Sequence, residues 1–93
     1  MLVGIYQVEL FIPASGSLKE KRFILKSLKS RIRNKFNVSV AEVADHDKWQ
    51  RAQLGLATVS NDRKVIDNMF NEIQKLILSE TRIELVDQHR DLY

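Results

Sequence analysis

Eight basic residues on one stretch of this chain are its strongest candidates for chemistry, and the chemistry they suit is anion binding. The stretch runs from Leu18 to Phe36, and its one acid is Glu20, so eight positive charges and one negative charge give +7 in a chain of net charge +3. A local excess of one sign indicates an anionic partner more strongly than net charge alone. The alternative is an ordinary solvated helix face, although such faces usually mix both signs. The candidate phosphate contacts, which would bind nucleic acid without regard to its sequence, are Lys19, Lys21, Arg22, Lys26, Lys29, Arg31, Arg33 and Lys35.

A helix should carry these basic residues. Ser17 followed by Glu20 fits a capping box, in which the serine hydroxyl accepts from a first-turn amide and the glutamate reaches back, so the helix should begin at Leu18. Apolar residues at helical spacing predict its buried side, and Asn37 is a plausible stop. The buried stripe is Leu18, Leu25, Leu28 and Ile32, with Phe23, Ile24 and Phe36 flanking it.

The turn ahead of this helix is a second candidate anion site. Ser15, Gly16 and Ser17 offer amides and hydroxyls at a helix start, where phosphate binds readily. The glycine and lysine spacing of a Walker loop is missing. A simple capping turn is the alternative, and the two interpretations are compatible.

Trp49 and Arg51 form the third candidate, at the predicted start of a hairpin strand. An exposed tryptophan beside an arginine could stack on a base. The alternative is a tryptophan that closes the end of a core or an interface.

The stretch Asp45-His46-Asp47 contains metal-ligand types, but a polar loop is the simpler interpretation because no second cluster accompanies it. No serine or threonine sits in a nucleophile motif, and no carboxylates pair convincingly. The sequence therefore gives no positive case for an enzyme and predicts no metal and no cofactor.

The order of elements predicts one α+β domain over residues 1–93. A βαββαβ order folds into a ferredoxin-like sandwich, a four-stranded antiparallel sheet with both helices on one face. The elements are a strand over residues 2–12, a helix from Leu18, strands over residues 38–44 and 52–60, a second helix capped by Ser60 or Asn61, and a strand over residues 81–87, with His89–Tyr93 as a tail.

The first strand is apolar on both faces. If its even positions face the helices, Val3, Ile5 and Phe11 lie on the sheet face that no helix covers. An apolar face left open on a small domain more often binds a partner, so we expect a homodimer through these three residues.

Cysteine is absent, the amino terminus lacks the basic leader of a signal peptide, and no apolar run is long enough to span a membrane. These features favour a cytoplasmic protein without membrane contact.

Four patches in order carry a resemblance to a known family. They are Ser17–Arg22, Arg31–Val43, Asp47–Ala52 and Gly55–Asp62. The pattern resembles the YlxP-like family, small bacterial proteins grouped as domain of unknown function 503, over essentially the whole chain. The resemblance implies a ferredoxin-like fold and supplies no catalytic residues. Members are often encoded beside translation initiation and ribosome-maturation factors, which implies a role near RNA or the ribosome.

Two main hypotheses about function follow, and an enzyme with an unrecognised site is the third. The first is a non-catalytic protein that associates with RNA or a ribosomal particle through the basic helix. The second is an assembly or regulatory module that uses the open sheet face, with the basic helix only keeping the protein in solution.

Overall fold

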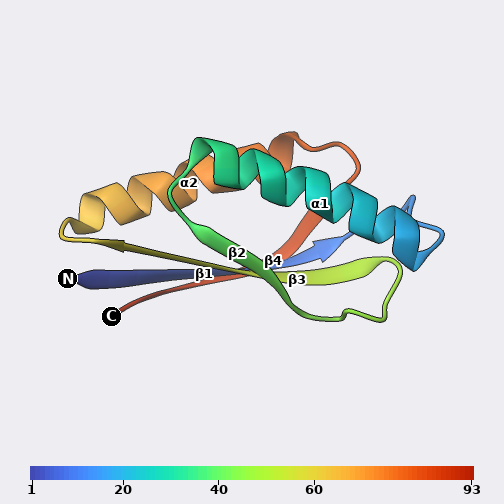
Figure 1. Ribbon diagram of the computed structural model, residues 1–93, viewed down its shortest axis with the longest axis horizontal. Coiled ribbons are helices and arrows are strands. Elements are labelled where there is room, and N and C mark those ends of the chain that lie inside the picture. Colours follow the sequence, from blue (N-terminus) through green and yellow to red (C-terminus); the bar gives the residue numbers. More distant parts are fainter.

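Two helices cover one face of a four-stranded antiparallel sheet in the computed structural model, which describes residues 1–93 (Figure 1). The elements in chain order are β1 Leu2–Phe11, α1 Leu18–Lys35, β2 Ser39–Ala44, β3 Arg51–Ser60, α2 Arg63–Ser79 and β4 Glu84–Leu92. The sheet order is β2-β3-β1-β4, with the two termini at the same end of the sheet. This is the predicted ferredoxin-like sandwich.

The core lies between the sheet and the helices. Even-numbered side chains of β1 are buried against the helices, as the alternation of the strand predicts. Gly4 lies where α2 approaches most closely, because a Cβ atom there would collide with Ile66 Cγ2 and lie 3.1 Å from Phe70 Cε2. The buried residues of α2, all at helical spacing, are Ile66, Phe70, Ile73 and Ile77.

The last strand begins later than predicted. Residues 81–82 form a turn, in which the Glu80 carboxylate accepts hydrogen bonds from both the backbone amide and the side chain of Arg82. The segment His89–Tyr93, predicted as a tail, pairs with β1 instead. The prediction was wrong because β4 is an edge strand whose mostly polar side chains do not show the apolar alternation of a buried strand.

The cap of α2 also differs from the prediction. Asp62, rather than Ser60 or Asn61, is the N-cap, and its carboxylate accepts from the Lys64 amide at 2.9 Å. Ser60 still contributes, because its hydroxyl accepts from the Asp62 amide at 3.0 Å. Ser60, Asn61 and Asp62 are all residue types that can cap a helix. Because β3 extends through Ser60, the cap falls at Asp62, one residue after the later of the two predicted positions. Neither helix has the length and apolar character needed to cross a membrane.

Candidate nucleic-acid interface

The basic helix α1 begins with the predicted capping box. Ser17 Oγ accepts from the Glu20 amide at 3.1 Å, and Glu20 Oε2 accepts from the Gly16 amide at 3.0 Å. Ser15 is buried and donates its hydroxyl to the Ser17 carbonyl oxygen at 3.1 Å. An external anion at this turn would therefore have to displace the Glu20 carboxylate. The turn is a cap in this structure, and anion binding there stays a prediction.

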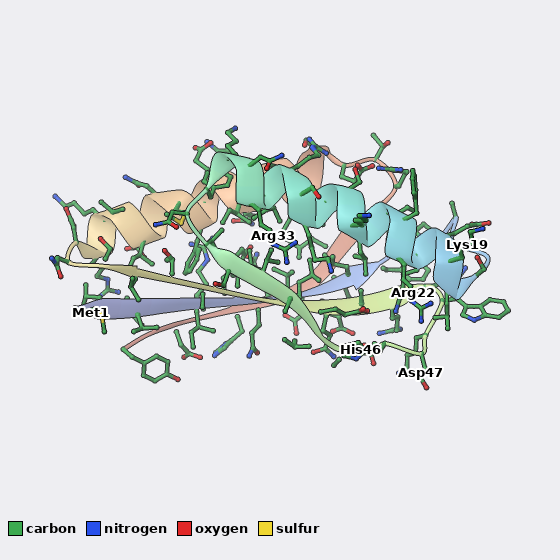
Figure 2. The ribbon with its side chains drawn as sticks, in the orientation of Figure 1. Met1, Lys19, Arg22, Arg33, His46 and Asp47 are labelled. Atoms are coloured by element: carbon green, nitrogen blue, oxygen red, sulfur yellow. The ribbon has the colours of Figure 1, made fainter.

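Five of the eight basic residues line one side of α1. Their spacing alternates between three and four residues, which keeps them within about a quarter of the helix circumference and along about 21 Å of its length. Figure 2 labels Lys19 and Arg22 near the helix start and Arg33 farther along. We call this set the cationic stripe, and it comprises Lys19, Arg22, Lys26, Lys29 and Arg33.

No residue of the cationic stripe has an acidic partner. Lys19, Arg22 and Lys26 are exposed, Lys29 is half-buried, and none of the four is within salt-bridge distance of a carboxylate. Arg33 donates from Nη2 to the Val40 carbonyl oxygen at 2.7 Å and so also protects the outer edge of β2. Five cations without an acidic partner on one helix side form a surface suited to a row of phosphates.

Arg31 and Lys35 lie outside the stripe. Arg31 pairs with the Glu80 carboxylate at 3.5 Å, and Arg82 pairs with the same carboxylate at 2.9 Å. The hydrogen bonds from Arg82 hold the pKa of Glu80 at about 2, despite the opposing effect of burial. Lys35 lines a shallow groove of about 520 Å³ between the two helices. The structure therefore separates these two residues from the five that share one side.

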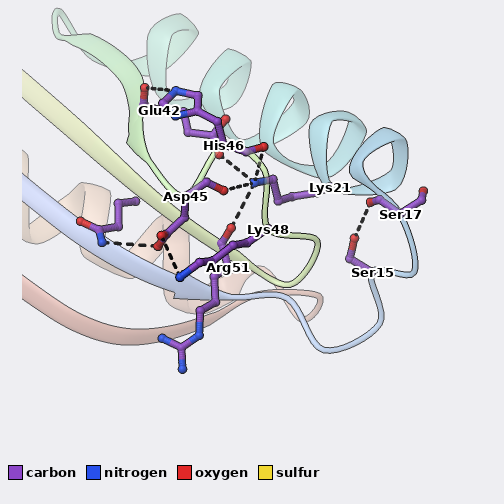
Figure 3. Close-up of polar contacts among 9 residues, drawn as sticks. Ser15, Ser17, Lys21, Glu42, Asp45, His46, Lys48 and Arg51 are labelled. Atoms are coloured by element: carbon purple, nitrogen blue, oxygen red, sulfur yellow. Dashed lines mark hydrogen bonds and ion pairs between the residues drawn. The ribbon is translucent and has the colours of Figure 1, made fainter.

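Lys21 is not available for phosphate contact, contrary to the prediction. Its side chain is fully buried (0% exposed), and its ammonium lies 3.0 Å from Glu42 Oε2 (Figure 3). The same group donates to the carbonyl oxygens of Asp45 at 2.7 Å and Arg51 at 3.1 Å, with His46 farther away at 3.4 Å. Lys21 therefore fastens the loop between β2 and β3 to the first turns of α1.

The loop that Lys21 holds contains Asp45, His46 and Asp47. Asp45 has a φ of 63°, a left-handed conformation that aspartate tolerates. Burial opposes ionisation of its carboxyl, but hydrogen bonds from Lys48 and Gln53 outweigh burial and lower its pKa. His46 Nε2 lies 3.1 Å from the Glu42 carbonyl oxygen. The Asp45 and His46 side chains thus bond to their neighbours, and no three His, Asp or Glu side chains converge as metal ligands would.

Trp49 lies exposed on this loop, with 56% of its surface accessible. It lines a depression of about 260 Å³ together with Phe11 and Arg51. Arg51 pairs with Glu9 at 2.8 Å on the open face of the sheet. This exposure leaves the Trp49 ring accessible to a base, and base stacking there stays a prediction.

Phe23 is a candidate that the sequence reasoning missed. It was predicted to flank the buried stripe of α1, yet 69% of its surface is exposed. Lys19 precedes it by four residues and Lys26 follows it by three, so all three share the outer side of the helix. The signal was present in the sequence, because Phe23 lies across the helix from Leu25, Leu28 and Ile32 at the helical period.

Polar residues interrupt the apolar side chains on the open face of the sheet. Val3, Ile5 and Phe11 do lie on it and are half-buried, but the exposed Gln7 and the Glu9 carboxylate lie between Ile5 and Phe11. Val3 has apolar neighbours across the strands, Val59 on β3 and Tyr93 after β4. The predicted interface is therefore split into two apolar ends by a polar centre. The acids on this face are Glu9, Glu84, Asp87 and Asp91, which makes it opposite in charge to α1.

Comparison with known proteins places the chain in a family. The sequence profile described as "Protein of unknown function (DUF503)" matches residues 3–90. The uncharacterized protein YlxP of Bacillus subtilis is 40% identical over 83 residues, which cover 89% of this chain and 90% of that protein. A de novo designed protein with a ferredoxin fold, solved by NMR, aligns with a TM-score of 0.55 at 11% identity, covering 99% of this chain and 85% of the design. The last similarity concerns the fold alone.

Proposed function

The chain belongs to the DUF503 family of proteins of unknown function, and we propose that it binds RNA through the cationic stripe of α1 without catalysing a reaction. The observation that carries the proposal is the row of five cations without an acidic partner on one helix side, Lys19, Arg22, Lys26, Lys29 and Arg33. RNA is preferred to DNA because the family resemblance implies a role near RNA or the ribosome.

The geometry of the stripe suits a phosphate backbone. Its length of about 21 Å lets several phosphates bind at once, each held by a long, mobile side chain. Contacts of this kind are independent of base sequence, so the expected mode is general RNA binding. The acidic open face of the sheet repels phosphate, which would orient the protein with its helices toward RNA.

A matched pair of triple variants tests the proposal. Both variants replace three cations on a helix by glutamine, which preserves helix propensity and lowers the net charge equally. The stripe variant carries Lys19→Gln, Lys26→Gln and Lys29→Gln. The control variant carries Arg63→Gln, Lys64→Gln and Lys75→Gln on α2.

The probe is fluorescein-labelled oligouridylate, titrated by anisotropy at about 100 mM salt. Each lost phosphate contact weakens binding about fivefold at this salt concentration, so the stripe variant should bind about a hundredfold more weakly. The control variant should lose less than about threefold, because it changes only the general field of the protein. Equal losses of affinity in the two variants would contradict the proposal, because the RNA would then respond only to the overall charge of the protein.

A second candidate function uses the open sheet face for a homodimer. The observation in its favour is the apolar end formed by Val3, Ile5, Val59 and Tyr93, of which Val59 is 57% and Tyr93 70% exposed. Val59→Glu should then halve the mass measured by light scattering, whereas Val65→Glu on α2 should not. A monomeric wild-type protein at high micromolar concentration would exclude this candidate.

A further inference from the structure

Two aromatic side chains are exposed on the two elements that Lys21 joins at the start of the cationic stripe. Phe23 is on α1 itself, and Trp49 is on the loop between β2 and β3. They expose 69% and 56% of their surfaces. Large aromatic rings are usually buried for their apolar area, so two exposed rings near a row of cations indicate a binding role.

The buried Lys21 ammonium brings these two elements together. Its bonds to the carbonyl oxygens of Asp45 and Arg51 fix both ends of the segment that carries Trp49. Figure 2 shows the loop residues His46 and Asp47 beneath the helix start, on the side of the molecule where Arg22 is labelled. A second contact on the same loop, from Gln50 Nε2 to the Pro13 carbonyl oxygen at 2.9 Å, ties it to the segment that leads into α1.

Around the axis of α1, two stripe cations separate Phe23 from the side of the helix that faces the loop. At about 100° per residue, Arg22 and then Lys19 follow Lys21 around the helix, and Phe23 comes next. Lys21 points to the loop that carries Trp49, so the path from this loop to Phe23 crosses Arg22 and Lys19. Aromatic rings on both sides of cations match a chain that alternates flat bases with phosphates.

We propose that the start of α1 binds single-stranded RNA, with Trp49 and Phe23 stacking on bases while Arg22 and Lys19 hold the phosphates between them. This inference rests on the proposed RNA binding and adds the strandedness of the ligand. A duplex keeps its bases stacked inside and offers no ring face to Trp49 or Phe23. Duplex RNA would therefore contact the cations alone.

Trp49 is the only tryptophan of the chain, so its fluorescence reports on its own environment. The wild-type protein is titrated with oligoadenylate and with an RNA duplex of equal length, in separate experiments at low salt. Stacking of a base on the indole should quench Trp49 emission with oligoadenylate and leave it nearly unchanged with the duplex. Binding of oligoadenylate without quenching would overturn the role of Trp49.

Phe23→Ala tests the second ring, with Leu78→Ala as control because Leu78 is 61% exposed on α2. The loss of one stacked base should weaken oligoadenylate binding about tenfold, with little effect on duplex binding. Leu78→Ala should change neither affinity. Equal effects of Phe23→Ala on both RNAs, or no effect on either, would overturn the stacking role.

These outcomes are separable from the fate of the proposed function. In one outcome the stripe variant loses RNA binding, Phe23→Ala binds single strands like the wild type, and single strands leave the Trp49 emission unchanged. RNA binding then stands and the single-strand inference falls. If the stripe variant binds as tightly as the wild type, the proposed function itself falls. Trp49→Phe should retain most of the affinity and Trp49→Ala should not, because the phenyl ring preserves a stacking face; equal losses in the two variants would count against stacking.

Discussion

The buried ammonium of Lys21 offers the sharpest test of how α1 and the loop between β2 and β3 are joined. Lys21→Met keeps the length and the apolar stem of the side chain but removes the charge and its donors. The Glu42 carboxylate, two loop carbonyl oxygens and the carbonyl oxygen of Arg51 at the start of β3 then lose their shared partner. The substitution therefore removes one partner of a buried ion pair and leaves the other in place.

The expected loss can be worked out from this geometry. Breaking a buried ion pair by removing one partner costs about 3–5 kcal/mol. Glu42 keeps 15% of its side-chain surface exposed, and the loop carbonyl groups can regain water, so the lower end applies. A loss of about 3 kcal/mol lowers the Tm of a domain of this size by about 12–24 °C.

The assay is urea and thermal unfolding, followed by far-ultraviolet circular dichroism for the helices and by Trp49 fluorescence for the loop. Lys26→Met is the matched control, because Lys26 is exposed on the same helix and bonds to no other side chain. It should change stability by less than about 0.5 kcal/mol. Adding Glu42→Gln to Lys21→Met should recover about 1 kcal/mol, since it removes the orphaned charge. A Tm for Lys21→Met within a few degrees of that for Lys26→Met would refute the role of Lys21 in fastening the loop between β2 and β3 to α1.

Two further predictions concern packing and pH. Gly4→Ala should destabilise the fold by about 1–3 kcal/mol in urea unfolding, because the added Cβ would collide with Ile66. The control Gly16→Ala should be nearly neutral, because its Cβ meets nothing closer than Glu20 at 3.9 Å. Equal effects of the two substitutions would contradict the close approach of α2 to β1. The pKa of Glu80 is lowered from 4.5 to about 2 in the fold, so its ionised form stabilises the protein fully above about pH 4.5, and this contribution is lost as the pH falls toward 2. The stability difference between wild type and Glu80→Gln should therefore shrink over this range, and a difference that stays constant with pH would argue against the Glu80–Arg82 cluster.

The fold could be predicted because its elements carry strong local signals. The alternation of β1, the capping box at Ser17 and the helical period of α2 each agree with the final structure. β4 was misplaced because an edge strand buries few side chains and so shows no clear alternation. The Arg82–Glu80 turn that delays its start depends on side-chain geometry that spacing alone does not reveal.

The candidate site was harder to predict because its residues differ in burial: Lys21 is buried, whereas most other basic residues of α1 are exposed. Lys21 shares a helix side with Leu25 and Leu28, and the period alone could have shown that it faces the core. Its partners could not be foreseen, since the carbonyl groups come from a loop whose path depends on the left-handed Asp45. Phe23 was assigned to the flank of the core because it is apolar, although its position on the helix is outward.

The salt dependence of RNA binding tests the central claim most directly. For the wild-type protein and oligouridylate, five phosphate contacts predict a slope of log K against log salt of about −3.5, so that affinity falls about a hundredfold between about 50 and 200 mM. The variant that lacks Lys19, Lys26 and Lys29 should retain two contacts and a slope of about −1.4. Parallel slopes for the two proteins, or wild-type binding that is insensitive to salt, would contradict RNA binding through the cationic stripe.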